Sequence, residues 1–207
     1  MATAVKICGI TRVEDALAAT RAGAEALGLV FYKPSPRYVT PEKAAEIIRA
    51  FPPFVTAVGL FVDPGADEVR AALAKAALQL LQFHGSETPE FCRQFARPYM
   101  KTVRMKEGVD LLQYARNYHD ARALLLDSYV EGLHGGSGAV FDWNLVPRDL
   151  PLPVVLSGGL TVQNVVEAVR KVRPAAVDVS SGVESAKGIK DARKIAAFIK
   201  EVRSAGV

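Results

Sequence analysis

Short apolar runs alternate with amphipathic stretches along the whole chain. The apolar runs predict eight β-strands, at residues 4–9, 26–31, 55–62, 78–83, 100–105, 123–127, 154–157 and 176–180. Between them, apolar residues recur at helical spacing and predict helices at 13–22, 41–50, 66–76, 89–96, 109–118, 162–172 and 191–203. Several strand runs are apolar at consecutive positions, hence on both faces. This pattern is typical of parallel strands covered by helices.

The order of these elements predicts an α/β fold. Eight strands in 207 residues give an average repeat of about 26 residues, which suffices for a short β-strand–helix unit. No Pro/Ser-rich linker divides the chain, so we expect one domain over residues 1–207: a (β/α)8 TIM barrel of eight parallel strands with outer helices. The alternative is an open doubly wound sheet. That fold usually has a G-x-G-x-x-G first turn, which Gly9-Ile10-Thr11 lacks.

Three helix starts can be predicted from capping residues. Thr40 precedes Pro41, a good N-cap followed by proline at the first helical position. Thr161 has the same position before the helix expected at 162–172, and Asp142 could cap a short sixth helix.

Composition and charge narrow the classes of function. Half of the residues are apolar, 23% are charged, the net charge is +4 and the pI is about 9.1. Lys and Arg are scattered and no reading motif is evident, which favours a small phosphate- or carboxylate-bearing ligand over nucleic acid. The chain shows no leader and no apolar run long enough to span a membrane, so we expect a soluble protein. Two cysteines without metal-ligand spacing predict no metal site and a reducing cytoplasm.

Two proton-transfer groups stand where apolar strands give way to turns. Cys8 ends the strand that contains Lys6-Ile7-Cys8, and Asp127 ends the run Leu124-Leu125-Leu126-Asp127. In a barrel the carboxyl ends of the strands converge on one mouth, where catalytic residues lie. A thiol and a carboxylate facing one cavity suggest a reaction that moves a proton without a cofactor.

Three turns after late strands contain glycine and serine: Gly135-Gly136-Ser137-Gly138, Ser157-Gly158-Gly159 and Ser180-Ser181-Gly182. Glycines let backbone N–H groups approach an anion, and serine hydroxyls add donors. In barrels the turns after strands 7 and 8 often form a phosphate site. The candidate binding residues are therefore Gly136, Gly158, Gly159, Ser180, Ser181 and Gly182. The alternative is that these glycines and serines only form tight turns and bind no ligand.

Seven segments, taken together, resemble phosphoribosylanthranilate isomerase. They are Lys6-Ile7-Cys8-Gly9-Ile10-Thr11, Gly28-Leu29-Val30-Phe31 with Ser35-Pro36-Arg37-Tyr38, Gln82-Phe83-His84-Gly85, Leu126-Asp127-Ser128, Gly135-Gly136-Ser137-Gly138 leading to Phe141-Asp142-Trp143, Leu156-Ser157-Gly158-Gly159-Leu160, and Val177-Asp178-Val179-Ser180-Ser181-Gly182-Val183-Glu184. They run in the expected order from residue 6 to residue 184. The departures are Phe83, where leucine is usual, and Ala139, where lysine is frequent.

The resemblance implies an activity and roles for particular residues. The family carries out an Amadori rearrangement in tryptophan biosynthesis, converting N-(5-phosphoribosyl)anthranilate to 1-(2-carboxyphenylamino)-1-deoxyribulose 5-phosphate without a cofactor. Asp127 would be the general acid and Cys8 the general base, which requires a poorly solvated carboxyl at 127 and a thiol near donors or positive charge at 8. Arg37 would hold the anthranilate carboxylate. The expected partner is a small phosphosugar, with no nucleic acid or membrane, and the protein would be a monomer or homodimer.

Several residues keep a structural alternative. Cys8 alone could be a small buried hydrophobe and Arg37 a solvated loop residue, while His84 could line the mouth or orient a loop. Cys92 is predicted to be structural, His119 and His134 to be surface residues, and Trp143 to pack against the barrel. Glu184 has no predicted role.

Strand parity predicts one buried ion pair. Alternate residues share a face, so Lys6 lies on the face of Cys8 and Asp178 on that of Ser180. Strands 1 and 8 are neighbours in a closed barrel, and an isolated buried lysine is costly, so we expect Lys6 to pair with Asp178 inside the barrel. The alternative is that Lys6 reaches the substrate.

Two other functions remain open at this point. Indole-3-glycerol-phosphate synthase, another phosphate-binding barrel of the same pathway, needs a catalytic lysine and usually has a longer N-terminal extension, whereas the first strand here begins near residue 4. A non-catalytic phosphate-ligand sensor could keep the glycine turns, but it would not need Cys8 and Asp127 together at the mouth.

Overall fold

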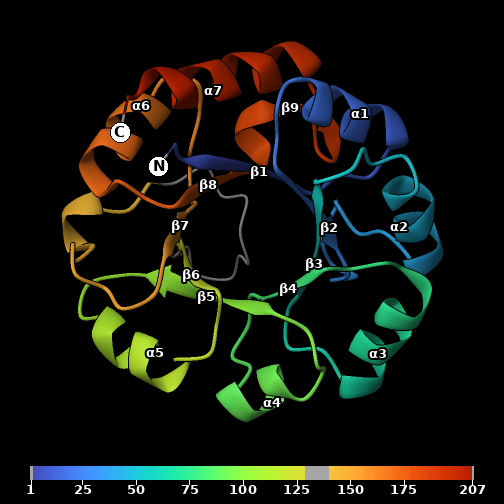
Figure 1. The fold of residues 1–207 in the computed structure, drawn as a ribbon, viewed down its shortest axis with the longest axis horizontal. Helices are drawn as coiled ribbons and strands as arrows, with labels where there is room; N and C mark the ends of the chain where they lie inside the picture. Colours follow the sequence, from blue (N-terminus) through green and yellow to red (C-terminus); the bar gives the residue numbers. More distant parts are fainter. Residues whose placement is uncertain (1, 129–139, 207) are drawn as a thin grey trace.

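Eight parallel strands close into a barrel surrounded by helices in this computed structural model, which describes residues 2–128 and 140–206 (Figure 1). Each strand pairs with the next along the chain, and β8 pairs with β1. The strands are β1 Ala4–Cys8, β2 Ala26–Val30, β3 Thr56–Phe61, β4 Leu80–Phe83, β5 Tyr99–Met105, β6 Ala123–Ser128, β7 Val154–Leu156 and β8 Ala176–Val179. The predicted (β/α)8 barrel is confirmed.

Helices form the outer layer of the barrel. They are α1 Val13–Arg21, α2 Pro41–Ile48, α3 Ala66–Lys75, α4 Pro89–Arg93, α5 Leu111–Asn117, α6 Val165–Val172 and α7 Ala192–Ser204. Between β6 and β7 the described residues hold only the 3-10 helix η1, Trp143–Leu145. Asp142 caps η1, as predicted, because its side chain accepts a hydrogen bond from Asn144 N at 2.9 Å.

The other capping predictions have mixed outcomes. Thr40 caps α2 by accepting from Lys43 N, as predicted. The prediction for Thr161 is wrong, because a turn occupies residues 162–164 and α6 begins at Val165. Asn164 Oδ1 accepts from Thr161 N at 2.8 Å, and this local bond stabilises the turn in place of a first helical turn.

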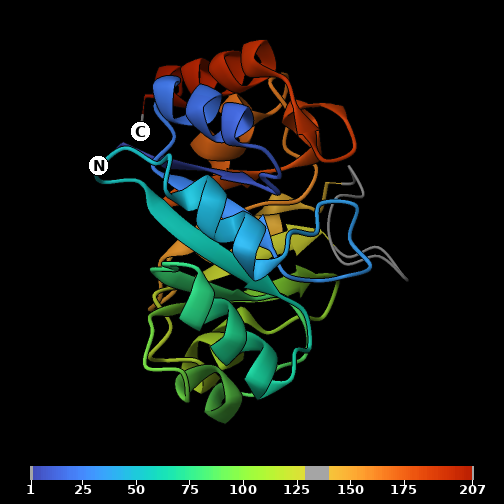
Figure 2. The same cartoon turned by 90° about the vertical axis from the view of Figure 1, so that its right-hand side faces the viewer.

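Two short elements after β8 are absent from the predicted set. The 3-10 helix η2 covers Ser181–Val183, and an antiparallel hairpin follows, formed by β9 Glu184–Ala186 and β10 Ile189–Lys190. In the side view the hairpin lies beyond the barrel on the side away from the labelled chain ends (Figure 2).

Side chains separate into an outer core and an inner filling. Val5, Ile7 and Leu27 belong to the large cluster between strands and helices. Inside the barrel, an apolar layer contains Val58, Met100, Ala123, Leu125 and Val155. Polar side chains lie above this layer, toward the carboxyl ends of the strands, and several of them line the candidate site.

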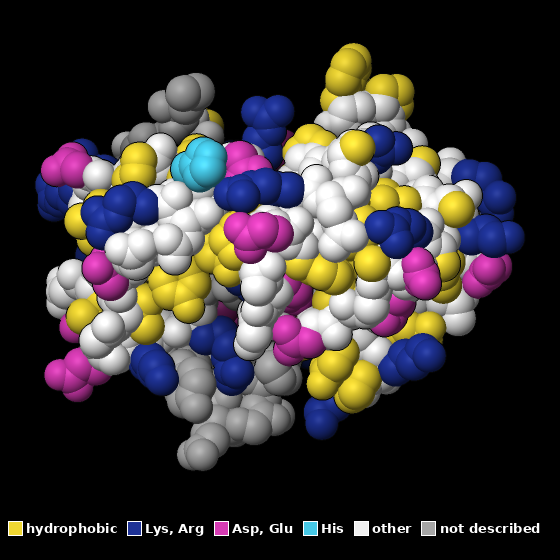
Figure 3. Space-filling model, turned by 90° about the horizontal axis from the view of Figure 1, so that it is seen from below, with side chains coloured by type: hydrophobic (Ala, Val, Ile, Leu, Met, Phe, Trp, Pro, Cys, Tyr) yellow, Lys and Arg dark blue, Asp and Glu magenta, His cyan; other side chains and the backbone are white. Residues whose placement is uncertain are grey.

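The surface in Figure 3 shows basic and acidic side chains interspersed, with no continuous basic stripe on that face. Trp143 is buried and His119 is exposed, both as predicted, whereas His134 lies outside the described residues. Among residues 2–128 and 140–206, no helix has the length and hydrophobicity needed to cross a bilayer.

Two adjacent leucines on α5 test this arrangement. Leu111 is 2% exposed and packs against the strands, whereas Leu112 is 42% exposed. We expect Leu111→Ala to lower the free energy of unfolding by about 2–5 kcal/mol through lost burial and a cavity. The matched control Leu112→Ala should change it by less than about 0.5 kcal/mol. Urea unfolding followed by circular dichroism measures both values, and equal effects would contradict the assigned helix face.

Candidate active site

A cavity of about 660 Å³, open mouth included, lies at the carboxyl ends of the strands. Nine of the ten predicted site residues line it: Cys8, Arg37, His84, Asp127, Gly158, Gly159, Ser180, Ser181 and Gly182. The tenth, Gly136, lies outside the described residues. Groups at the carboxyl ends of β1, β4, β6, β7 and β8 therefore face one space.

Cys8 is the last residue of β1 and its side chain faces the cavity. The Cys8 and Lys6 side chains of β1 can lie close to β2 only because residue 28 is glycine. A Cβ at Gly28 would stand 2.8 Å from Cys8 Sγ and 3.1 Å from Lys6 Nζ. Burial raises the pKa of the Cys8 thiol above its ordinary value, and the positive charges of Lys6 and Lys190 offset this only in part. The expected positive charge is present, but burial outweighs it and the thiol is neutral near pH 7.

Beneath Cys8, Lys6 and Asp178 form the predicted ion pair. Lys6 Nζ lies 2.8 Å from Asp178 Oδ1, and the two side chains are 4% and 6% exposed. They are register partners on β1 and β8. Ser157 Oγ also lies 3.5 Å from Asp178 Oδ2, at the limit of a hydrogen bond. The predicted pairing of Lys6 with Asp178 is therefore confirmed.

Asp127 enters the cavity from β6 and is buried, as expected for a poorly solvated carboxyl. Its Oδ1 accepts from Ser128 N at 2.9 Å. Its Oδ2 lies 3.1 Å from His84 Nε2, which is within ion-pair distance, although the alignment is not that of a hydrogen bond. His84 thus contacts the carboxyl as well as lining the mouth.

His84 is held by Gln82 from the same face of β4. Gln82 Nε2 lies 3.2 Å from His84 Nδ1. If the amide donates to Nδ1, the ring proton resides on Nε2, the ring nitrogen within ion-pair distance of Asp127; this tautomer is assigned from the hydrogen-bond network. No sequence motif predicts the contact between His84 and Asp127, because β4 and β6 are not neighbours in the sheet.

Beside Asp127, the turn after β7 requires glycine. Gly158 has a φ of 82°, in the left-handed region that side chains disfavour. A Cβ at this position would also clash with Ser128 and stand 3.0 Å from Asp127 Oδ1. The turn therefore lies directly against the carboxyl group and brings Gly158 and Gly159 into the same wall as Ser180, Ser181 and Gly182.

Arg37 reaches the cavity rim from the loop after β2, where it meets a residue with no predicted role. Its Nε and Nη2 lie 2.7 and 2.8 Å from the two carboxylate oxygens of Glu184, at the start of β9. This pairing raises the pKa of Arg37. The sequence pattern does not predict this role for Glu184, because it does not predict the hairpin that positions the residue. Its place at the end of the Val177–Glu184 motif was the one available signal.

The barrel and this mouth define a class: a (β/α)8 barrel enzyme with a buried carboxyl group, a buried thiol and turns of glycine and serine around one cavity. Comparisons then identify the family. The family described as N-(5'phosphoribosyl)anthranilate (PRA) isomerase matches residues 5–201, and the chain belongs to this family.

Individual relatives are similar over nearly their whole length. The N-(5'-phosphoribosyl)anthranilate isomerase of Nitrosospira multiformis is 60% identical over 202 residues, which are 98% of this chain and 97% of that protein. The crystal structure of phosphoribosyl anthranilate isomerase from Thermotoga maritima has a TM-score of 0.90 at 41% identity, covering 98% and 99% of the two chains. A phosphoribosyl anthranilate isomerase in complex with reduced 1-(o-carboxyphenylamino)-1-deoxyribulose 5-phosphate has a TM-score of 0.87 at 41% identity, with the same coverage.

The protonation state of Cys8 can be tested without any assumption about the reaction. Because burial raises its pKa, we expect iodoacetamide to modify Cys8 slowly at pH 7, with a rate that rises about tenfold per pH unit beyond pH 9. Peptide mapping by mass spectrometry separates Cys8 from Cys92, whose pKa burial raises to about 12. A rate for Cys8 that is already constant between pH 6 and pH 8 would show a resting thiolate instead.

Proposed function

We propose that this protein is a phosphoribosylanthranilate isomerase, which converts N-(5-phosphoribosyl)anthranilate to 1-(2-carboxyphenylamino)-1-deoxyribulose 5-phosphate in tryptophan biosynthesis. The observation that carries the proposal is the convergence of Cys8 and Asp127 on one cavity whose wall holds the glycine and serine turns. Family membership supports the same reaction. The alternatives, indole-3-glycerol-phosphate synthase and a phosphate-ligand sensor, gain no support from these observations.

The reaction is an internal redistribution of protons. Asp127, protonated, donates its proton to the ribose ring oxygen as the bond between that oxygen and C1 breaks, which leaves an iminium at C1. Cys8, as thiolate, removes the proton from C2, and the electron pair of that bond forms the C1–C2 double bond of an enol-amine. The enol then loses its hydroxyl proton while C1 gains one, giving the ketone. Atoms and electrons balance without an oxidant or reductant, so the residues need only move protons.

The remaining predicted residues would bind the substrate at its two anionic ends. We assign the phosphate to the wall formed by Gly158, Gly159, Ser180, Ser181 and Gly182, where backbone N–H groups and hydroxyls can approach it closely. We assign the anthranilate carboxylate to Arg37 at the rim, because a guanidinium matches a carboxylate in shape and charge. His84 would orient Asp127. Gly136 stays a prediction.

The expected partner is a small phosphosugar, and we infer a cytoplasmic location. Cys8 and Cys92 are both free and buried, which is compatible with a reducing compartment. The oligomeric state, monomer or homodimer, stays a prediction that light scattering on the purified protein measures directly.

Two substitutions test the acid and the base. We expect Asp127→Ala and Cys8→Ser each to lower kcat by about 10²–10⁴-fold, the usual contribution of general acid or base assistance. Turnover is followed by the loss of anthranilate-type fluorescence from phosphoribosylanthranilate. Circular dichroism and the melting temperature should remain close to those of the parent protein.

Matched controls use the same residue types away from the cavity. Cys92 is fully buried in α4, and Asp67 is fully exposed on α3. Cys92→Ser and Asp67→Ala should keep kcat within about threefold of the parent value, because neither side chain reaches the cavity. Near-normal turnover in Cys8→Ser or Asp127→Ala would remove that residue from the mechanism, and no turnover in the parent protein would remove the proposed function itself.

A further inference from the structure

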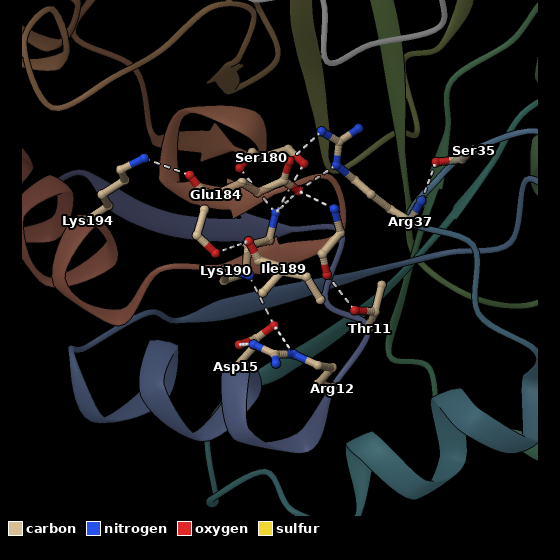
Figure 4. Close-up of polar contacts among 12 residues, drawn as sticks. Thr11, Arg12, Asp15, Ser35, Arg37, Ser180, Glu184, Ile189, Lys190 and Lys194 are labelled. Carbon is tan, nitrogen blue, oxygen red and sulfur yellow. Dashed lines mark hydrogen bonds and ion pairs between the residues drawn. The ribbon is translucent and has the colours of Figure 1, made fainter.

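Glu184 lies between two cations: Arg37, which lines the cavity, and Lys190, which contacts Ser180 (Figure 4). On one side its carboxylate receives Nε and Nη2 of Arg37 in a bidentate pair. On the other, its Oε1 lies 2.9 Å from Lys190 Nζ, and Gly188 N donates to the same oxygen at 3.4 Å. Burial would raise the pKa of Glu184, but the two cations outweigh it and the pKa is lowered, so Glu184 is ionised.

Lys190 joins this carboxylate to the proposed phosphate wall. Its Nζ is fully buried and donates to Ser180 O at 3.1 Å and to Ser180 Oγ at 3.3 Å. Burial lowers the pKa of Lys190, and the charge of Glu184 opposes this. Lys190 therefore links the Glu184 carboxylate to Ser180, with one contact to the former and two to the latter.

The hairpin that carries these residues is itself fixed to the barrel. Lys190 N donates to Asp15 Oδ2 at 3.2 Å, Lys194 Nζ donates to Glu184 O at 2.7 Å, and Thr11 Oγ1 donates to Gly188 O at 2.6 Å. The backbone that carries the Glu184 side chain is thus held by contacts with the loop after β1, with α1 and with α7. It is a rigid base for the long, flexible side chain of Arg37.

We propose that Glu184 is a positioning residue that holds Arg37 in the orientation that binds the substrate carboxylate, so that it sets the preference of the site for carboxylate-bearing ligands. The inference rests on the proposed function, to which it adds a specificity determinant. A guanidinium has five N–H donors, and the pair with Glu184 uses two of them on the Nε–Nη2 edge. Three donors at the other end remain for a ligand.

Charge and entropy both favour this role. Arg37, Lys190 and Glu184 together carry a net charge of +1, so the cluster still attracts one anionic group after Glu184 is counted. An arginine held in one conformation also loses less side-chain freedom when a ligand binds. Without the Glu184 carboxylate, the Arg37 guanidinium would lose its ion-pair partner, and the buried Lys190 would lose the same partner.

The opposite reading of the same contact is that Glu184 competes with the ligand for Arg37. In that case neutralising Glu184 would strengthen the binding of a carboxylate. The two readings predict opposite signs for one measurement, which makes the role testable.

The experiment compares two ligands that differ by one group. The first is reduced 1-(2-carboxyphenylamino)-1-deoxyribulose 5-phosphate, and the second is the same compound without the ring carboxylate. Calorimetry gives Kd for each, and the ratio of the two values is the carboxylate preference. We expect Glu184→Gln to reduce this preference about tenfold or more, as the loss of an oriented charged contact does. Kd for the carboxylate-free ligand should change much less.

Two further variants separate positioning from a general structural effect. Lys190→Met should weaken both ligands by a similar factor and leave the carboxylate preference unchanged, because Glu184 still holds Arg37. In an Arg37→Lys background, Glu184→Gln should have no further effect on the preference, since both changes remove one interaction. Glu68→Gln, an exposed Glu on α3, is the matched control and should change neither Kd.

Stability is controlled by removing both buried charges together. Glu184→Gln leaves Lys190 without its counter-ion, so the double variant Glu184→Gln/Lys190→Met is measured if the single variant unfolds. We expect the double variant to fold and to show the same reduced carboxylate preference as Glu184→Gln. An unchanged or increased preference in a folded Glu184→Gln variant, or an equal loss for both ligands, would overturn the inference. Failure of the parent protein to isomerise phosphoribosylanthranilate would instead overturn the proposed function.

Discussion

The ion pair between Lys6 and Asp178 is the constraint on which the mouth of the barrel depends. It joins the first strand to the last across the seam where the sheet closes. Either charge alone would be costly in this buried position, so the two residues stabilise the structure only together. Cys8 lies two residues beyond Lys6 and Ser180 two residues beyond Asp178. The strand register at this ion pair therefore fixes the heights of the Cys8 thiol and of Ser180 relative to each other.

The charges around the cavity are arranged by strand. Asp127 and His84 come from β6 and β4, whereas Lys6 and Asp178 come from β1 and β8 on another part of the ring. Lys190 lies behind Ser180, and Arg37 reaches the rim beside Glu184. A substrate with a phosphate at one end and a carboxylate at the other could meet positive charge at both ends, with its sugar carbons between the carboxyl and the thiol.

What the sequence could predict follows from the range of the interactions involved. Hydrophobic periodicity identified all eight barrel strands, and strand parity was enough to pair Lys6 with Asp178. The start of α6 could not be predicted from Thr161. The backbone N–H of Thr161 donates to the side chain of Asn164, three residues on, and this bond stabilises a turn where the first helical turn was expected. The pair of Arg37 with Glu184 spans 147 positions and depends on a hairpin of two short strands that have no clear periodicity. Contacts set by one strand pair were predictable, and contacts set by the packing of loops were not.

In the proposed mechanism, the burial of Cys8 determines the order of the two proton transfers. The Cys8 thiol is neutral near pH 7 because burial raises its pKa more than Lys6 and Lys190 lower it. Ring opening by Asp127 creates a positively charged iminium next to C2, and a cation placed close to the thiol lowers its pKa further. The thiol, whose own proton passes to water at the open mouth of the cavity, therefore ionises most readily after the acid has acted. At that stage the C2 proton that the thiolate removes is also most acidic. A fully solvated thiol would respond much less to the same charge, because water screens it. The low exposure that makes Cys8 a poor base at rest makes it sensitive to the intermediate it must deprotonate.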